Sequence, residues 1–218
     1  RLIGAMIMIH NDDYGLILPP KIAPIQVIII PIIKTNKYKI KIHNIIKIIK
    51  KNLKKKKIRV KCDNNNNITP GKKFYKYDKM GIPLRITIGE NEINNNFIEI
   101  TRRDNFKKYF LKIKNNLNKK ILKILKKIQI NIYKIAQTNM KKKTYIIDDY
   151  NIFKKKLYKN CGFIISHWDK NYKTELNIQK ETKATIRCIP NNNKYKEKGK
   201  CIYSGKKSNQ RVVFGKSY

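Results

Sequence analysis

The sequence predicts an α/β fold, with a mixed sheet flanked by helices and a smaller α+β unit after it. Continuous β-branched runs, such as residues 26–32, are typical of strands that are covered on both faces. Apolar residues recur at helical spacing over residues 38–53 and again over residues 113–136. Strand-like and helix-like segments that alternate along a chain favour a sheet layered with helices. At 218 residues, 41% of them hydrophobic, the chain can bury such a core.

The first part of the chain accounts for the mixed sheet. Residues 1–10 are an apolar segment that could be the end of a buried helix. Pro19, Pro20 and Pro24 then mark a boundary or linker, because proline disfavours a helix at the residue before it. The elements expected next are a strand over 26–32, a helix over 38–53, a strand over 58–63, a turn and short helix over 69–81, and strands 83–89 and 97–103 as an antiparallel hairpin around a loop.

The second part begins with a long helix whose lysine-rich outer face is expected to be solvated. Its apolar stripe consists of Ile113, Leu117, Ile121, Leu125, Ile128, Ile132 and Ala136. Asp148 or Asp149 could then cap a helix that runs to Leu157. The remaining expected elements are a strand over 162–166, a helix over 174–183, and strands over 184–190 and 211–217.

A formal net charge of +38 indicates a polyanionic partner, because Lys and Arg side chains bind phosphates and release counterions. Lys, Asn and Ile crowd every segment, so part of this charge reflects compositional bias. The sign still favours nucleic acid over an acidic protein or a membrane surface. We expect no membrane span, since the longest apolar run, residues 28–33, is short and contains Pro31.

The cysteines indicate a reducing compartment. They lie far apart, at positions 62, 161, 188 and 201, and do not form the dense framework of a disulfide-stabilised protein. The first residues also lack the cleavage site of a signal peptide. We therefore expect free thiols and a cytoplasmic location. Because the chain begins with Arg rather than Met, we expect it to be part of a longer polypeptide.

Three stretches, by their order and spacing, resemble one family. They are HNDDYGLILPPKIAPIQVIIIPI, TPGKKFYKYDKMGIPLRITIG with RRD, and KATIRCIP with CIYSGKKSNQRVVFGKSY. Together they resemble prolyl-tRNA synthetases of the archaeal/eukaryote type. The resemblance implies the end of a class II catalytic domain and a linker in 1–23, an anticodon-binding domain in 24–112, a long connecting helix in 113–140 and an extra α+β domain in 141–218.

The resemblance also implies site residues. Arg1 matches the motif 3 arginine that contacts an ATP phosphate in this family. Asp78, Arg85 and Lys107 match positions that would read the two guanines of a proline anticodon, since guanine offers acceptors to Arg or Lys and donors to a carboxylate. The backbone contacts would be Lys73, Arg102 and Arg103, with Phe74 as a packing or stacking residue.

Simpler interpretations of two of these residues stay open. Asp78 stands where the family usually has Glu, and it could be a solvated helix carboxylate paired with a nearby lysine. Arg85 could be a strand residue that faces solvent.

The stretch CIYS near the end of the chain has the form of half a zinc knuckle with serine in place of the second cysteine. In this family's extra domain the four ligand positions would fall at Asp169, Thr174, Cys201 and Ser204, of which one is a cysteine. Because a structural zinc site needs four thiolate or imidazole ligands, we predict no zinc.

Other groups near this stretch do not change that expectation. His167 and Asp169 could substitute for lost ligands, but a histidine beside Trp168 is more often a core residue. Without metal, apolar packing and side-chain hydrogen bonds must hold the loop ends together. The terminal Tyr218 is expected to be structural, and near the active site in the whole enzyme.

The implied function is the ATP-dependent attachment of proline to its tRNA through a prolyl-adenylate. The implied partners are tRNA for proline, proline, ATP with Mg²⁺, and a second subunit bound through the catalytic domains. This chain would supply anticodon binding and the C-terminal domain, and it is expected to be inactive alone because motifs 1 and 2 and the proline pocket are absent. Two alternatives stay open: a non-catalytic basic RNA-binding module, and a zinc-dependent interaction domain.

Overall fold

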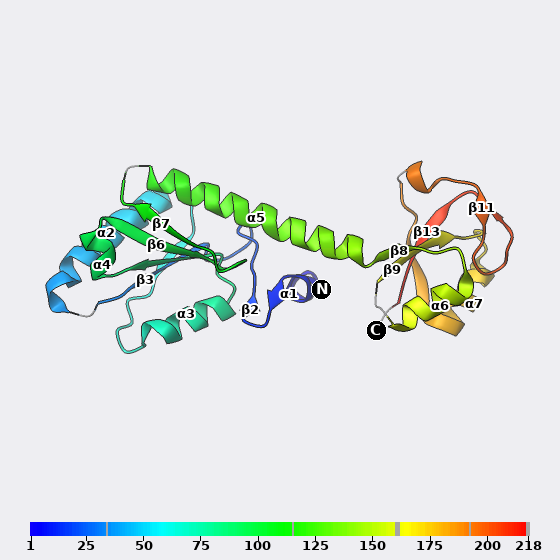
Figure 1. The fold of residues 1–218 in the computed structure, drawn as a ribbon, viewed down its shortest axis with the longest axis horizontal. Coiled ribbons are helices and arrows are strands. Elements are labelled where there is room, and N and C mark those ends of the chain that lie inside the picture. Colours follow the sequence, from blue (N-terminus) through cyan, green and yellow to red (C-terminus); the bar gives the residue numbers. More distant parts are fainter. Residues whose placement is uncertain (34, 115, 160–161, 192, 217–218) are drawn as a thin grey trace. The chain divides into compact units, whose positions relative to one another are not determined.

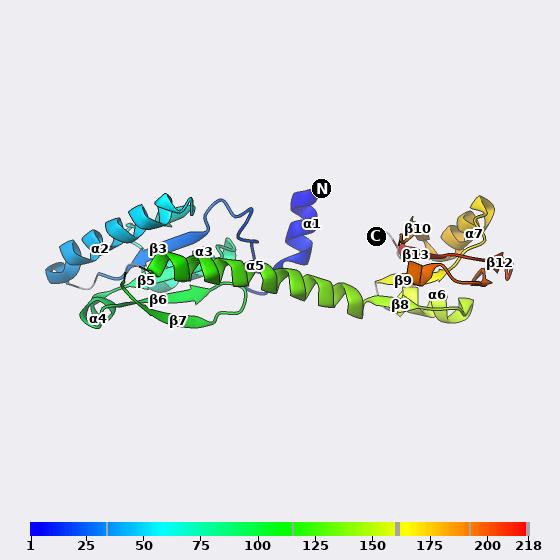
Figure 2. The same cartoon turned by 90° about the horizontal axis from the view of Figure 1, so that it is seen from above.

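The computed structural model describes residues 1–33, 35–114, 116–159, 162–191 and 193–216. Two compact units divide the chain at Ala136/Gln137, and each is described by itself (Figures 1 and 2). The division falls inside α5 (Leu117–Lys142). Cys161 and Tyr218, named in the sequence predictions, lie outside the described residues.

The first unit is built on a five-stranded mixed sheet in the order β4-β3-β5-β6-β7. β3 pairs in parallel with both β4 and β5, whereas β5, β6 and β7 pair antiparallel. The strands are β3 (Val27–Pro31), β4 (Val60–Cys62), β5 (Leu84–Ile88), β6 (Phe97–Arg102) and β7 (Lys108–Lys112). The predicted mixed α/β sheet is therefore confirmed, with one strand more than expected.

Helices cover the two faces of this sheet unequally. α2 (Asn36–Lys55), α4 (Glu90–Asn94) and α5 pack on one face, where the larger apolar core lies. α3 (Pro70–Lys79) packs on the other face, over Ile28 and Ile30 of β3. Figure 1 shows α5 and α3 on opposite sides of the sheet. On the sheet face where α3 packs, β5, β6 and β7 carry mainly polar side chains.

The N-terminal segment was predicted as a buried helix end, and the burial is wrong. α1 (Leu2–Ile9) is helical, but Leu2 is 88% and Ile3 71% exposed, because none of the described residues covers this helix.

The hairpin that follows α1, β1 (Asn11–Asp12) with β2 (Gly15–Leu16), lies directly against the end of α3. Gly81 has φ +74°, and a Cβ there would lie 2.6 Å from the carbonyl oxygen of Leu16. Only glycine fits this approach.

The second unit is a four-stranded sheet in the order β10-β13-β9-β8 with two helices. Its elements are β8 (Thr144–Ile146), α6 (Tyr150–Lys159), β9 (Phe163–His167), α7 (Tyr172–Thr182), β10 (Ala184–Cys188), a 3₁₀ turn (Asn193–Tyr195), β11 (Gly199–Lys200), β12 (Lys207–Ser208) and β13 (Arg211–Lys216). The core includes Phe153, Ile178 and Phe214. Asp149 caps α6, since its Oδ1 accepts a hydrogen bond from the amide of Ile152 at 2.8 Å.

No helix in the described part of the chain is both long and apolar enough to cross a bilayer.

Candidate nucleic-acid interface

The sheet face that α3 leaves partly open carries polar and aromatic side chains in register. Residues directly opposite each other on antiparallel strands project on the same face. Arg85 lies opposite Thr101, which lies opposite Lys108 on β7. The next row of the same face consists of Thr87, Glu99 and Phe110. We call these six residues the polar sheet face.

Arg85 is held between a carboxylate and an aromatic ring, both supplied by α3. Its Nη1 donates to Asp78 Oδ1 and Oδ2 at 3.0 and 2.9 Å, and its guanidinium carbon lies 4.1 Å from the ring centroid of Phe74. Arg85 is buried, so it does not face solvent. Asp78 pairs with this arginine rather than with a lysine. The structure thus brings Asp78, Arg85 and Phe74 together.

Next to this pair, three polar atoms are buried without a hydrogen-bond partner: Arg85 Nε, Thr87 Oγ1 and Thr101 Oγ1. These are the side-chain atoms with this property within the described residues. The three residues are neighbours on the polar sheet face. An unsatisfied buried donor or acceptor costs about 1–3 kcal/mol. The face therefore holds hydrogen-bonding capacity that the described residues leave unused.

Arg102 is paired inside the fold. Its Nε and Nη2 donate to Asp104 Oδ1 and Oδ2 at 2.9 and 2.5 Å, and the side chain of Asp104 is completely buried. Asn131 of α5 donates to the same carboxylate at 2.7 Å. Hydrogen bonding to Asp104 raises the pKa of Arg102 above its ordinary value. Arg102 as a whole is 6% exposed, and through Asp104 it supports the packing of α5.

Arg103 joins the N-terminal hairpin to α3. Its Nη1 and Nη2 donate to Asp12 Oδ2 and Oδ1 at 2.7 and 2.5 Å, and its Nε donates to the backbone oxygen of Asp78 at 2.7 Å. Hydrogen bonding to Arg103 lowers the pKa of Asp12. The arginine is 2% exposed, so its donors are used within the protein.

Lys73 is also buried and paired. Its Nζ lies 3.5 Å from Asp63 Oδ1 and donates to the Asp63 backbone oxygen at 3.2 Å. Tyr77 donates to Asp63 Oδ2 at 2.9 Å, and burial together with this carboxylate raises the pKa of Tyr77 to about 12. Burial alone would raise the pKa of Asp63, but the amide of Asn65, the Tyr77 hydroxyl and Lys73 together lower it.

The other two predicted residues are exposed. Lys107 lies in the turn between β6 and β7, where its backbone oxygen accepts from the amide of Arg102 at 3.1 Å and its Nζ lies 5.9 Å from the ring centroid of Tyr109. Arg1 lies at the start of α1.

In the second unit, hydrogen bonds join three of the four positions that the resemblance assigns to zinc ligands. Asp169 Oδ2 accepts from Thr174 Oγ1 at 3.0 Å and from Ser204 Oγ at 2.7 Å. The fourth position, Cys201, is buried, and its backbone amide donates a hydrogen bond to the backbone oxygen of Lys206 at 2.7 Å. Burial would raise the pKa of Asp169, but the Ser204 hydroxyl, the Asn171 amide and the Thr174 hydroxyl together lower it. A shared carboxylate therefore links the loop ends.

His167 is a packed core residue. Its Nδ1 lies 3.3 Å from Ser208 Oγ, its Nε2 lies 4.0 Å from Glu197 Oε1, and burial lowers its pKa. A Cβ on Gly199 would lie 2.2 Å from Nε2, so the ring fills the space beside that glycine. Within the described residues, no three His, Cys, Asp or Glu side chains are grouped to hold a metal ion. The absence of zinc stays a prediction.

We expect Asp169→Ala to lower the free energy of unfolding of the second unit by about 2 kcal/mol, because Thr174 and Ser204 lose a charged acceptor. The chain has one tryptophan, Trp168, whose Nε1 donates to the Asn171 backbone oxygen at 3.2 Å. Urea unfolding followed by Trp168 fluorescence therefore reports on this unit.

The control for this change is Asp13→Ala, an exposed carboxylate of the first unit, which should leave the Trp168 transition unchanged. The pKa of Asp169 is lowered in the folded chain, so its contribution is complete above the unfolded pKa and is lost as the pH falls. The variant should thus lose less stability than the parent between about pH 6 and about pH 3. A variant as stable as the parent would contradict the bridging role of Asp169.

Sequence reasoning missed Thr87, Glu99, Thr101, Lys108 and Phe110. Alternation along the predicted strands 83–89 and 97–103 could have placed Thr87 and Thr101 on the face of Arg85. Lys108 and Phe110 could not be found without β7.

Two family models match the chain. The model described as "Anticodon binding domain" matches residues 26–124, and the model described as "Prolyl-tRNA synthetase, C-terminal" matches residues 150–218. The two matches lie in the first and the second unit.

Similar proteins and structures extend over the whole chain. The proline–tRNA ligase of Cytophaga hutchinsonii is 46% identical over 218 residues, and that of Amoebophilus asiaticus is 43% identical over 218 residues. Each alignment covers 100% of this chain and 44% of the relative. A crystal structure of prolyl-tRNA synthetase from Cryptosporidium parvum complexed with L-proline and AMP has a TM-score of 0.90 and 33% identity, over 99% of this chain and 46% of that one.

Proposed function

We propose, on the premise that this chain belongs to the prolyl-tRNA synthetase family and carries its anticodon-binding and C-terminal domains, that it supplies the tRNA-binding portion of a proline–tRNA ligase. The chain spans about 44% of the length of the curated relatives that it matches. The proposed division keeps residues 1–23 as the end of the catalytic domain with its linker, 24–112 as the anticodon-binding domain, 113–140 as a connecting helix and 141–218 as the C-terminal domain.

In the proposed full-length enzyme, the carboxylate of proline attacks the α-phosphate of ATP, which releases pyrophosphate and leaves prolyl-adenylate. A hydroxyl at the 3′ end of the tRNA then displaces AMP. Arg1 is the residue of this chain that the resemblance assigns to ATP. The other contacts to ATP and Mg²⁺ would come from the portion of the relatives that this chain does not cover. A homodimer and a cytoplasmic location are part of the same proposal, and they rest on the family resemblance.

The observation that carries the proposal is the Arg85–Asp78 pair, held over Phe74 beside the unsatisfied atoms of the polar sheet face. Arginine donates to guanine O6 and N7, and a carboxylate accepts from the N–H groups of the opposite guanine edge. The pair keeps both groups in place before RNA binds. Thr87 and Thr101, whose hydroxyls can donate and accept, would complete the contacts to an unstacked base.

The remaining residues divide into contact and support. Lys107 is exposed in the turn after β6 and is free to reach a guanine or a phosphate. Arg85 is also buried and ion-paired, but its Nε has no partner, whereas no buried side-chain nitrogen of Lys73, Arg102 or Arg103 lacks one among the described residues. This difference favours a supporting role for these three over direct backbone contacts. Arg102 would hold the turn that carries Lys107, since the two share a backbone hydrogen bond at 3.1 Å.

Binding of the chain to tRNA transcripts tests the proposal. We expect a transcript with a proline anticodon to bind about tenfold or more tightly than one in which both anticodon guanines are replaced, because each mismatched base costs about 1–3 kcal/mol. Fluorescence anisotropy at fixed ionic strength measures the two affinities. Equal affinities would rule out anticodon recognition by this chain and leave only non-specific binding by charge.

A further inference from the structure

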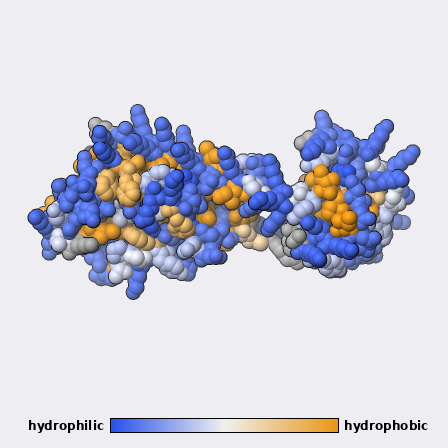
Figure 3. Space-filling model, in the orientation of Figure 1, coloured by the Kyte–Doolittle hydropathy of each residue, from blue (hydrophilic) through white to orange (hydrophobic). Residues whose placement is uncertain are grey.

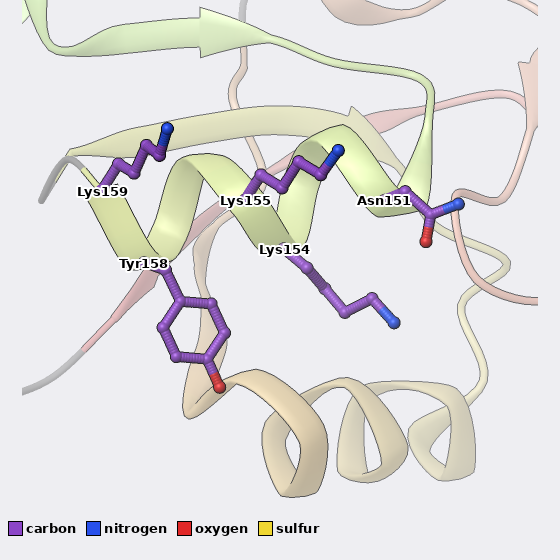
Figure 4. Close-up of a pocket in the computed structure, with 5 residues that line it drawn as sticks. All are labelled: Asn151, Lys154, Lys155, Tyr158 and Lys159. Atoms are coloured by element: carbon purple, nitrogen blue, oxygen red, sulfur yellow. The ribbon is translucent and has the colours of Figure 1, made fainter.

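Helix α6 of the second unit carries a basic face with an exposed tyrosine. Asn151, Lys154, Lys155, Tyr158 and Lys159 recur at helical spacing and line an open depression of about 490 Å³ (Figure 4). On the opposite side of α6, Phe153 is fully buried and Leu157 is 4% exposed. Because that side is anchored in the core, the basic face has a fixed position on the surface.

Two lysines of this face have no ion-pair partner among the described residues. Lys154 lies 3.8 Å from Glu181 of α7 and 4.8 Å from the ring centroid of Tyr150, so it is partly engaged. The ion pairs formed by described residues of this unit include neither Lys155 nor Lys159. Figure 4 shows these two side chains projecting together from one side of α6. Two ammonium groups on the same side of α6, with no carboxylate partner in the part of the unit that the structure describes, favour an anionic ligand.

Tyr158 gives this face an aromatic surface. The residue is 73% exposed, and Lys216 Nζ lies 5.5 Å from the centroid of its ring. An exposed ring gains nothing from core packing, but it can stack on a nucleobase while neighbouring lysines bind the phosphates. The carboxylates of an acidic protein would pair with the lysines but would not stack on the Tyr158 ring. The combination therefore favours nucleic acid.

The charge of the whole unit agrees with this partner. Residues 137–218 contain 20 Lys and Arg against 6 Asp and Glu, a net charge of +14, and α6 itself contains no acidic residue. Figure 3 shows hydrophilic residues over most of the visible surface of both units. Hydrophilic residues are thus widespread, and the α6 face is distinguished by the exposed Tyr158, which projects on the side of Lys154, away from Lys155 and Lys159 (Figure 4).

We infer that the α6 face is a second RNA-binding surface, which takes a single-stranded segment with one unpaired base on Tyr158 and phosphates on Lys155 and Lys159. Stacking accepts any base, so the contact is independent of sequence and separate from anticodon reading. The inference rests on the proposed function only for the identity of the RNA as tRNA.

The test compares three variants of the full chain with the parent: Lys155→Gln/Lys159→Gln, Tyr158→Ala, and the control Lys206→Gln/Lys207→Gln, which removes the same charge from exposed lysines of the same unit. The probes are a fluorescein-labelled oligouridylate and two tRNA transcripts with different anticodons. Far-UV circular dichroism checks that each variant is folded.

We expect the α6 lysine variant to lose about fivefold or more in affinity, and its salt slope to fall by about 0.7 for each lost phosphate contact. Tyr158→Ala should lose about fivefold or more, since stacking contributes about 1–3 kcal/mol per base. Both losses should be equal for the two tRNAs, even if anticodon recognition fails. Equal losses in the α6 and control lysine variants, unchanged affinity in Tyr158→Ala, or equally tight Tyr158-independent binding of polyglutamate would each overturn the inference.

Discussion

Replacing Arg85 with alanine should weaken binding of a tRNA with a proline anticodon by about 5- to 150-fold, the equivalent of roughly 1–3 kcal/mol for one bidentate contact to guanine. The guanidinium is held by Asp78 at 2.9 Å and over Phe74, so the parent protein spends little conformational entropy to present it. Alanine removes the donors and leaves Asp78 without its partner. The affinity for a transcript that lacks the anticodon guanines should hardly change.

The comparison needs a control for bulk charge. Lys55→Ala, at the exposed end of α2, should weaken binding of every RNA equally and flatten the salt dependence slightly. Arg85→Lys keeps the charge and loses the bidentate geometry, so it should bind RNA but discriminate poorly between anticodons. Equal losses for all transcripts in Arg85→Ala would remove the assigned role from this residue.

Asp104→Ala should have the largest effect on stability, about 3–5 kcal/mol, because it leaves Arg102 as an uncompensated buried charge. The carboxylate is completely buried and also accepts from Asn131, so α5 loses a contact to the sheet as well. Thermal unfolding followed by circular dichroism should show the first unit melting at a lower temperature. The unfolding temperature of the second unit, followed by Trp168 fluorescence, should stay unchanged.

Two variants control this measurement. Asp13→Ala removes an exposed carboxylate from the same unit and should change the free energy of unfolding by less than about 0.5 kcal/mol. Asp104→Asn keeps the shape and part of the hydrogen bonding, so its loss should lie between those of the two alanine variants. A loss in Asp104→Ala no greater than that in Asp13→Ala would show that Arg102 finds another partner.

Hydrophobic periodicity predicted most of the fold. It located α2 and α5, because one face of each helix must be apolar, and continuous β-branched runs located the strand that is buried on both faces. It missed β7, in which Tyr109 and Leu111 point to the core from between exposed neighbours, and assigned Ile113 to the helix that begins at Leu117. Five residues of alternating pattern are too few to stand out beside a helical stripe.

Chemistry at the candidate site was less accessible from the sequence. The family resemblance placed Asp78, Arg85 and Phe74 at one site, and the structure brings them into contact. The sequence could not show which arginines are buried in ion pairs, because some of the partner carboxylates lie far away along the chain. Asp12, the partner of Arg103, lies 91 positions away along the chain.

The three bonds of Arg103 have a mechanical consequence. The Arg103 guanidinium donates to both the carboxylate of Asp12 and the backbone oxygen of Asp78. The hairpin also packs closely on Gly81 at the end of α3. A pull on residues 11–16 must therefore either rupture charge-assisted bonds or drag the end of α3 with it. The hairpin is thereby coupled to α3, the helix that carries Asp78, so force applied to the hairpin is transmitted to the carboxylate that we propose accepts from guanine.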